Sequence, residues 1–219
     1  MTVCNHVRMR QGGASQADEC CVAAARYTHD LAARTRVLDH VGMSMPALLH
    51  RPVLVTARLD LHELRADDAA FMLALLNDPA FIEHIGDRGV RTLDDARAYV
   101  QAGPVASYAE HGFGLYRVEE RATRASVGLC GLLRRPTLDD VDIGFAFLPA
   151  FRSRGFAREA AQAVLGHAHA VLGLRRIVAI VAPGNAASAR LLEHLGFRFE
   201  RRLAHGDSGE ELQLFAWNA

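Results

Sequence analysis

The chain has 219 residues, of which 50% are apolar and 7% aromatic, and its 25 acidic side chains balance its 25 basic ones. This length and apolar content are sufficient for a buried core, which argues against global disorder. The absence of an excess positive charge argues against a general nucleic-acid binder, so we expect no nucleic-acid partner.

Cysteines and apolar runs limit the cellular context. Cys4, Cys20, Cys21 and Cys130 form no CxxC pair, so the sequence predicts neither a disulfide framework nor a metal site. The first twenty residues lack the apolar stretch of a signal peptide, and no run of about 18 apolar residues is long enough to span a bilayer. We therefore expect a cytoplasmic protein with no membrane partner and no metal.

Residues 1–50 differ from the rest of the chain, because they are polar at first and then only weakly helical over 18–41. We interpret 1–50 as an extension, weakly helical or disordered, and 51–219 as one domain. One hypothesis is that translation starts at Met43 or Met45 and that the preceding residues come from a mis-called start. The alternative is a genuine helix that packs on the domain.

The first half of the domain predicts a strand, helices and a meander. Apolar and polar residues alternate over 53–61, which predicts a strand. Acidic residues in the first turn predict helices at 67–76 and 92–100, and the second of these resumes after Gly103-Pro104. Strand-like segments at 113–118, 126–133 and 141–148 are separated by charged turns, which is typical of an antiparallel meander.

The second half predicts a parallel crossover. Residues 155–172 have a helical apolar period, and 177–182 is a continuous apolar run of the kind found in a strand covered on both faces. Strand, helix and buried strand in succession imply a right-handed parallel crossover from 141–148 to 177–182. A short helix at 185–195 and a hairpin of 197–203 with 211–217 complete a mixed α/β sheet with helices on both faces.

The most informative local signal is Arg152-Ser153-Arg154-Gly155-Phe156-Ala157, which lies directly between a strand and a long helix. The free N–H groups and the dipole of a helix N-terminus favour an anion, and a glycine permits close approach to the backbone. The alternative is a solvated basic turn whose glycine serves only the backbone conformation.

The segments on either side of this loop carry a family resemblance. Asp142 to Pro149 precedes it, and Asn185-x-x-Ser188-x-x-Leu191-Leu192-Glu193-x-x-Gly196-Phe197 follows the next strand. Together with Arg152-x-x-Gly155-x-Ala157, they resemble the GNAT superfamily of acetyl-CoA-dependent N-acetyltransferases, most closely its ribosomal-protein-alanine branch. The similarity covers roughly residues 53–217.

The resemblance implies an acetyl-CoA site in a V-shaped gap where the strand ending at Leu148 diverges from 177–182. Backbone groups near Phe147 and Leu148 would pair with the pantetheine arm, and an N–H near Phe147 would polarise the thioester carbonyl. The implied cofactor contacts are Phe147, Leu148, Arg152, Ser153, Arg154, Gly155, Phe156, Ala157, Asn185, Ser188 and Leu192.

The sequence departs from the family pattern at the position of the catalytic acid. Many members use a Tyr acid four residues before the Gly-Phe pair, where this sequence has Leu192. Ser188 is the best-placed hydroxyl for that role, and Asp142 is the candidate base, acting through water. The alternative for Asp142 is a solvent-facing strand carboxylate. A further alternative is that proximity and orientation supply most of the catalysis, with no single indispensable side chain.

The acceptor pocket is expected from the segment between the first two helices, 81–91, and from His111, which precedes the second strand. Its candidate substrate-binding residues are Glu83, Asp87, Arg88 and His111, and the alternative for the segment 81–91 is a capped surface loop. The implied acceptor is a protein N-terminus or a small amine, and a homodimer is common in this family.

The predicted function is transfer of acetyl from acetyl-CoA to a primary amine by direct attack in a ternary complex. A non-catalytic acyl-CoA-binding sensor on the same fold is the alternative, because the Tyr is missing.

Overall fold

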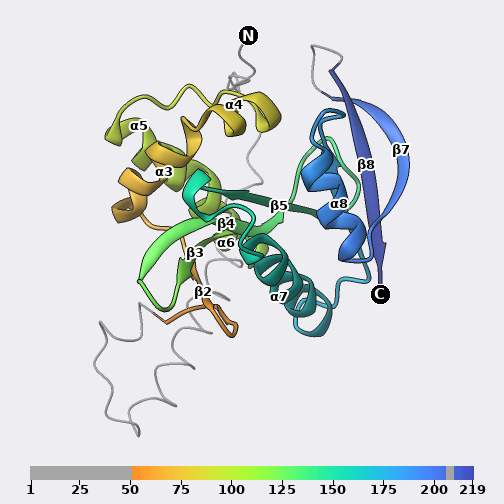
Figure 1. Cartoon of the computed structure of the whole chain (residues 1–219), viewed down its shortest axis with the longest axis horizontal. Helices are drawn as coiled ribbons and strands as arrows, with labels where there is room; N and C mark the ends of the chain where they lie inside the picture. Colours follow the sequence, from red (N-terminus) through yellow and green to blue (C-terminus); the bar gives the residue numbers. More distant parts are fainter. Residues whose placement is uncertain (1–50, 206–209) are drawn as a thin grey trace, which may run out of the picture. The chain divides into compact units, whose positions relative to one another are not determined.

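A computed structural model describes residues 51–205 and 210–219, so the predictions for 1–50 and for the turn 206–209 lie outside the described residues. Its strands are β1 (Leu54–Val55), β2 (Leu59–Glu63), β3 (Leu115–Glu120), β4 (Ala125–Leu133), β5 (Asp142–Phe147), β6 (Arg176–Val181), β7 (Arg198–His205) and β8 (Glu210–Asn218). Its helices are α3 (Ala69–Leu76), α4 (Pro79–Ile85), α5 (Leu93–Val100), α6 (Ala106–His111), α7 (Phe156–Ala170) and α8 (Ala186–His194), as Figure 1 shows. Short turns of 3-10 helix lie at η1 (Ala66–Asp68) and η3 (Pro149–Phe151), and a π-helical turn lies at η2 (Gln101–Val105).

The described strands form an eight-stranded sheet in the order β1-β2-β3-β4-β5-β6-β8-β7. Neighbouring strands are antiparallel except for β5 and β6, which form the parallel pair that the α7 crossover requires. The predicted meander, crossover and C-terminal hairpin are therefore confirmed, and so is the mixed α/β fold class.

Helices cover both faces of this sheet. Helix α7 buries Ala160, Ala161, Val164 and Ala168 in a core that includes residues of β2, β3, β4 and β6. Helices α3 and α5 pack on the other face, where Leu129 of β4 joins their cluster. No described helix is both long and apolar enough to cross a membrane.

The segment 53–61 is a tight hairpin, not the single strand that its alternation predicts. The Thr56 backbone N–H donates to the Leu59 carbonyl (2.8 Å), and the Thr56 hydroxyl oxygen accepts from the Leu59 N–H (2.9 Å). The turn therefore rests on a threonine side chain, which mimics a backbone turn without the Gly, Pro or Asn that usually marks one.

The segment between the first two helices is also more ordered than a loop. Asp78 is the N-cap of α4, because its side chain accepts from the Phe81 N–H (3.1 Å), and Pro79 occupies the first turn. The Asn77-Asp78-Pro79 sequence thus ends α3 and begins α4. This second helix brings residues 80–85 to the functional site.

Candidate functional site

The parallel strands β5 and β6 share a single register pair, Asp142 with Val178, near the start of both strands. The Leu148 N–H donates to the Val127 carbonyl on β4 (3.0 Å). Because successive residues of a strand direct their N–H and C=O groups to opposite sides, those of Phe147 point away from β4, toward the gap that opens beside β5. The strand end therefore presents a backbone donor and a backbone acceptor at the gap.

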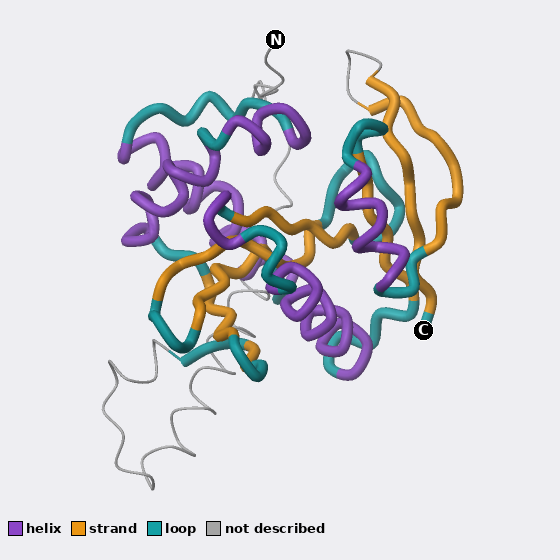
Figure 2. Tube along the Cα trace, in the orientation of Figure 1, coloured by secondary structure: helices purple, strands orange, loops and turns teal. Residues whose placement is uncertain are grey.

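The loop from β5 to α7 has the backbone conformation of an anion site. Ser153 and Gly155 both adopt left-handed conformations, with φ of 59° and 78°. At Gly155 an added Cβ would also lie 3.3 Å from the Arg58 Nη2 atom. Such conformations turn neighbouring N–H groups toward one point, and no side chain of the described residues caps the N-terminus of α7. These features fit the pyrophosphate of coenzyme A. Figure 2 shows this loop between the group α3 to α5 and helix α8.

The two loop arginines are both held by protein acceptors. Arg152 donates from Nε to the Phe147 carbonyl (2.8 Å) and pairs through Nη2 with the Asp78 carboxylate. Arg154 pairs through Nη2 with Glu120 Oε1 (2.7 Å), and its guanidinium lies 4.6 Å from the centroid of the Phe156 ring. Both guanidinium groups therefore anchor the loop to neighbouring elements while adding positive charge to it.

A cavity of about 460 Å³ lies where this loop, the end of β5, α4 and the start of α8 meet. Its lining includes the predicted cofactor residues Phe147, Arg152, Ser153, Gly155, Phe156, Ala157, Asn185 and Ser188. Asn185 caps α8 by accepting from the Ser188 N–H (3.0 Å), which fixes both residues at the cavity edge. The remaining lining residues are Leu75, Ala80, Phe81, His84, Ile85, Phe145, Ala146, Phe151, Arg158, Ala187 and Leu191.

Three predicted cofactor residues do not line the cavity. The Leu192 side chain, on the inner face of α8, is fully buried in the core. The adjacent Leu191 lines the cavity instead. Leu148 and Arg154, the partner of Glu120, are also absent from the lining of the described cavity. The place that other members give to Tyr thus faces the core.

Asp142, the predicted base, is not brought to the cavity. It begins β5, at the opposite end of the strand from Phe147, and it is 1% exposed. Its Oδ2 atom lies 2.5 Å from Arg135 Nε. Burial raises the pKa of Asp142, and the ion pair with Arg135 only partly offsets that effect. Neither of the sequence interpretations, a base in the site or a solvent-facing carboxylate, matches this buried ion pair.

The four predicted acceptor residues also lie outside the cavity lining of the described residues. Asp87 pairs with Arg91 (2.5 Å), and the His111 ring packs on Phe113 with centroids 5.7 Å apart. Glu83 and Arg88 are exposed. The lining does include Phe81, His84 and Ile85, which belong to the segment 81–91 expected to form the acceptor pocket but were not among its four candidate residues. The signal that could have revealed their helix is the cap sequence Asp78-Pro79.

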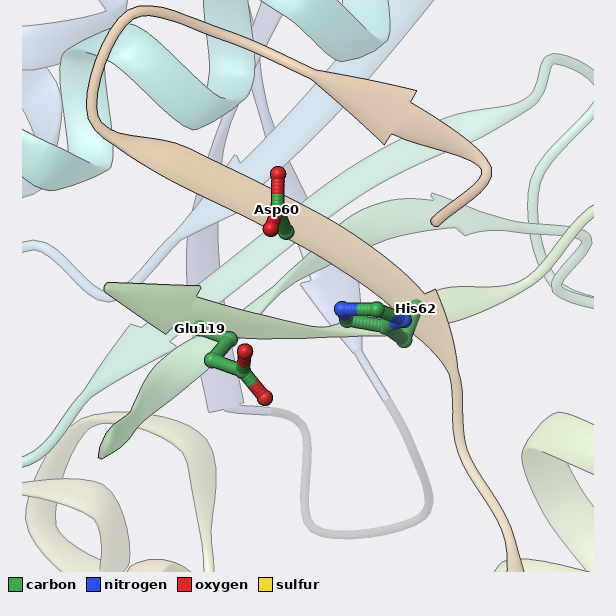
Figure 3. A group of neighbouring side chains, drawn as sticks. All are labelled: Asp60, His62 and Glu119. Carbon is green, nitrogen blue, oxygen red and sulfur yellow. The ribbon is translucent and has the colours of Figure 1, made fainter. Parts of the chain in front are cut away.

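A second group of polar side chains lies away from the cavity, on the sheet face formed by β2 and β3. Figure 3 shows Asp60 and His62 of β2 beside Glu119 of β3, and their ligand atoms lie within 4.8 Å of one another. Although these residue types can bind a metal, Arg124 Nη1 already lies 3.2 Å from Asp60 Oδ2 and 2.9 Å from Glu119 Oε1. The position between the carboxylates is therefore taken by a guanidinium, and the group is an ion-pair cluster.

A family model for the acetyltransferase (GNAT) domain matches residues 58–198. The chain belongs to this family. The family confirms the predicted class of enzyme, an acetyl-CoA-dependent acyltransferase.

Individual relatives agree with this family. The uncharacterized N-acetyltransferase YoaA of Bacillus subtilis is 29% identical over 150 residues, covering 68% of this chain and 84% of that protein. A solved GNAT-family acetyltransferase from Bordetella pertussis is 29% identical with a TM-score of 0.64, covering 76% of this chain and 99% of its own. The spermidine N-acetyltransferase of Vibrio cholerae, solved with CoA and spermine, is 20% identical with a TM-score of 0.61, covering 74% and 96%. This last likeness concerns the fold alone.

Asp78 has two functions that substitution can separate, because it caps α4 and also pairs with Arg152. We expect Asp78→Asn to keep the cap but lose the charged hydrogen bond, lowering the free energy of unfolding by about 1.5–3 kcal/mol. Asp78→Ala removes the cap as well and costs roughly 1 kcal/mol more. Urea denaturation measures both values, and equal losses for the two variants would contradict the capping role.

His62 makes stability depend on pH. Burial, followed by the charge of Arg117, lowers the pKa of His62, and these effects exceed the opposite influence of Glu119 and Asp60. As pH falls through about 6.5, the unfolded chain binds a proton that the folded chain resists, so stability is lost. Between about pH 7.5 and pH 5.5 we expect the melting temperature of wild type to fall more than that of His62→Gln. Comparing the two proteins cancels the contribution of Asp142, and parallel losses would contradict the prediction.

Proposed function

We propose that the protein transfers the acetyl group of acetyl-CoA to a primary amine by direct attack within a ternary complex. The observation that carries the proposal is the cavity beside the diverging end of β5, bordered by the left-handed loop at Ser153 and Gly155. It joins an anion site, a backbone donor and an apolar chamber within one space. A transfer from a bound thioester to a second substrate requires all three.

The chain's own groups suit the parts of acetyl-CoA. The loop residues 153–157 and the N-terminus of α7 would hold the pyrophosphate. The Phe147 carbonyl, which accepts from Arg152 Nε (2.8 Å), keeps a second lone pair that would accept from the pantetheine arm. The outward N–H of Phe147 would polarise the thioester carbonyl. Asn185 and Ser188 would border the thioester end from α8. When bound, acetyl-CoA supplies the activated acetyl group.

Proton transfer must accompany acetyl transfer. The amine nitrogen forms a bond to the carbonyl carbon as the carbon–sulfur bond breaks, so the amine loses a proton and the thiolate gains one. Among the described residues of the cavity lining, His84 carries the one imidazole, whose ring nitrogens can accept and release a proton, and Ser188 supplies a hydroxyl. We propose His84 as the base, in place of Asp142, and Ser188 as the donor to sulfur, directly or through water.

The sequence motifs also support a domain boundary and a branch within the family. We infer that the domain spans residues 51–219 and belongs to the ribosomal-protein-alanine N-acetyltransferase branch, on the support of Asn185, Ser188 and the Gly196-Phe197 pair. The acceptor would then be a protein N-terminus or a small amine.

Arg154→Glu tests the pyrophosphate loop. The substitution replaces positive charge with negative charge beside the N-terminus of α7 and places it next to Glu120. We expect the dissociation constant of CoA to rise at least about tenfold, as measured by calorimetry. Arg202→Glu is the matched control, because Arg202 also forms an exposed ion pair, with Glu211 (3.4 Å), on the distant strand β7. Equal changes in the two variants would refute the loop as the binding site.

Ser188→Ala tests the chemical step separately from binding. Because Ser188 caps nothing with its hydroxyl and its backbone N–H bond to Asn185 remains, α8 should be retained. We expect kcat for thiol release to fall on the order of 10²-fold with little change in CoA affinity. An unchanged kcat would exclude Ser188 as the proton donor. Wild-type protein that binds CoA but releases no thiol with any amine would contradict the proposed transfer itself.

A further inference from the structure

The cavity wall opposite the proposed cofactor loop is apolar. It is formed by one face of α4, with Ala80, Phe81, His84 and Ile85, and by Leu75 of α3. We call these five residues the α4 wall. Since the loop and the start of α8 are assigned to acetyl-CoA, the α4 wall is the surface left for the acceptor.

No carboxylate belongs to the lining of the described cavity, whose charged side chains are the guanidinium groups of Arg152 and Arg158. Of the nearby carboxylates, Asp78 pairs with Arg152 and Asp87 pairs with Arg91, while Glu83 of α4 is exposed and lies outside the lining. A polyamine brings several positive charges, and each needs a carboxylate or water when it enters an apolar site. The α4 wall supplies no carboxylate for these charges.

The wall does offer apolar surface to a ligand. Ile85 is 40% exposed although it lines the cavity, and Phe81, Phe145 and Phe147 add aromatic area around the same space. Exposed apolar surface inside a concave site stabilises a ligand that covers it. The volume of about 460 Å³ is sufficient for an acetyl thioester together with a compact apolar group.

We propose that the acceptor is a primary monoamine attached to an apolar aliphatic or aromatic group, which packs on the α4 wall, and that polyamines are poor substrates. This inference rests on the proposed function and deepens it. The apolar group would pack on the α4 wall and bring the amine to His84. A free arylalkylamine and a peptide whose first residue is apolar both present a primary amine next to an apolar group.

The test compares acceptors with wild-type protein and saturating acetyl-CoA, following thiol release. Phenethylamine, a peptide with N-terminal Phe and spermidine are the three probes. We expect at least one of the first two to exceed spermidine in kcat/KM by tenfold or more, and the better of them identifies the source of the amine. Spermidine equal to or better than both would overturn the proposal.

Variants on α4 test whether the wall sets this preference. Ile85→Asp places a carboxylate on the wall at an exposed position, so we expect kcat/KM for spermidine to rise about tenfold and that for phenethylamine to fall. Ile82→Asp is the matched control, because Ile82 lies on the same helix with similar exposure but is not part of the lining. The control should keep the wild-type preference. An Ile85→Asp variant that folds and also keeps it would overturn the role of the wall.

Binding separates this inference from the proposed transfer. Calorimetry on the protein saturated with CoA should show at least one of phenethylamine and the peptide with N-terminal Phe binding more tightly than spermidine. That result without any thiol release would refute the transfer but support the acceptor class. Tighter binding of spermidine than of both would refute the acceptor class even if transfer occurs.

Discussion

The site depends on the way β5 leaves β6. A parallel pair that continued along its length would use the backbone groups of Phe147 within the sheet, and no gap would exist. The single register pair at Asp142 and Val178 joins the two halves of the sheet at one end and leaves the other end open. The buried ion pair of Asp142 with Arg135 lies at the closed end. Asp142 therefore contributes to the fold at the junction and not to the chemistry at the gap.

The open end needs its own support, and Arg152 provides it. One guanidinium contacts the last carbonyl of β5 and the N-cap residue of α4, so a single side chain links the strand end, the loop and the helix that borders the cavity. The arginine that the motif places beside the cofactor also positions the wall on which the acceptor is proposed to pack.

The sequence predicts most of the fold because the strands, the helical period of α7 and the order strand-helix-strand can be recognised in short stretches of sequence. Its prediction of elements is wrong where one short signal is compatible with two structures. Asn77-Asp78-Pro79 ends α3 as expected, but the same Asp78 caps α4, and no periodic pattern of seven residues is long enough to show that helix. The turn at Thr56 has no glycine or proline, so the hairpin of β1 and β2 reads as one strand.

The candidate site likewise has parts that the sequence predicts and parts that it does not. The residues of the loop follow one another in the sequence, so their position at one helix N-terminus is predictable. Ion pairs such as Arg152 with Asp78 join residues 74 positions apart, and no pattern in one sequence predicts such a partner. The strand pattern likewise places Asp142 in β5 but does not predict that its carboxylate is buried in an ion pair with Arg135.

The loss of the family Tyr is explained by what surrounds Leu192. This side chain has no solvent exposure and packs in the core with residues such as Phe197 and Phe215, so a Tyr there would bury a hydroxyl among apolar groups. A proton donor on α8 must instead lie on the helix face that borders the cavity, where Ser188 and Leu191 are found one turn apart. With a weak acid such as serine, positioning by the loop, the Phe147 backbone and the α4 wall must carry a larger part of the rate acceleration. The enzyme should then depend strongly on how well the acceptor fits the wall, because a poorly placed amine gains little from the acid.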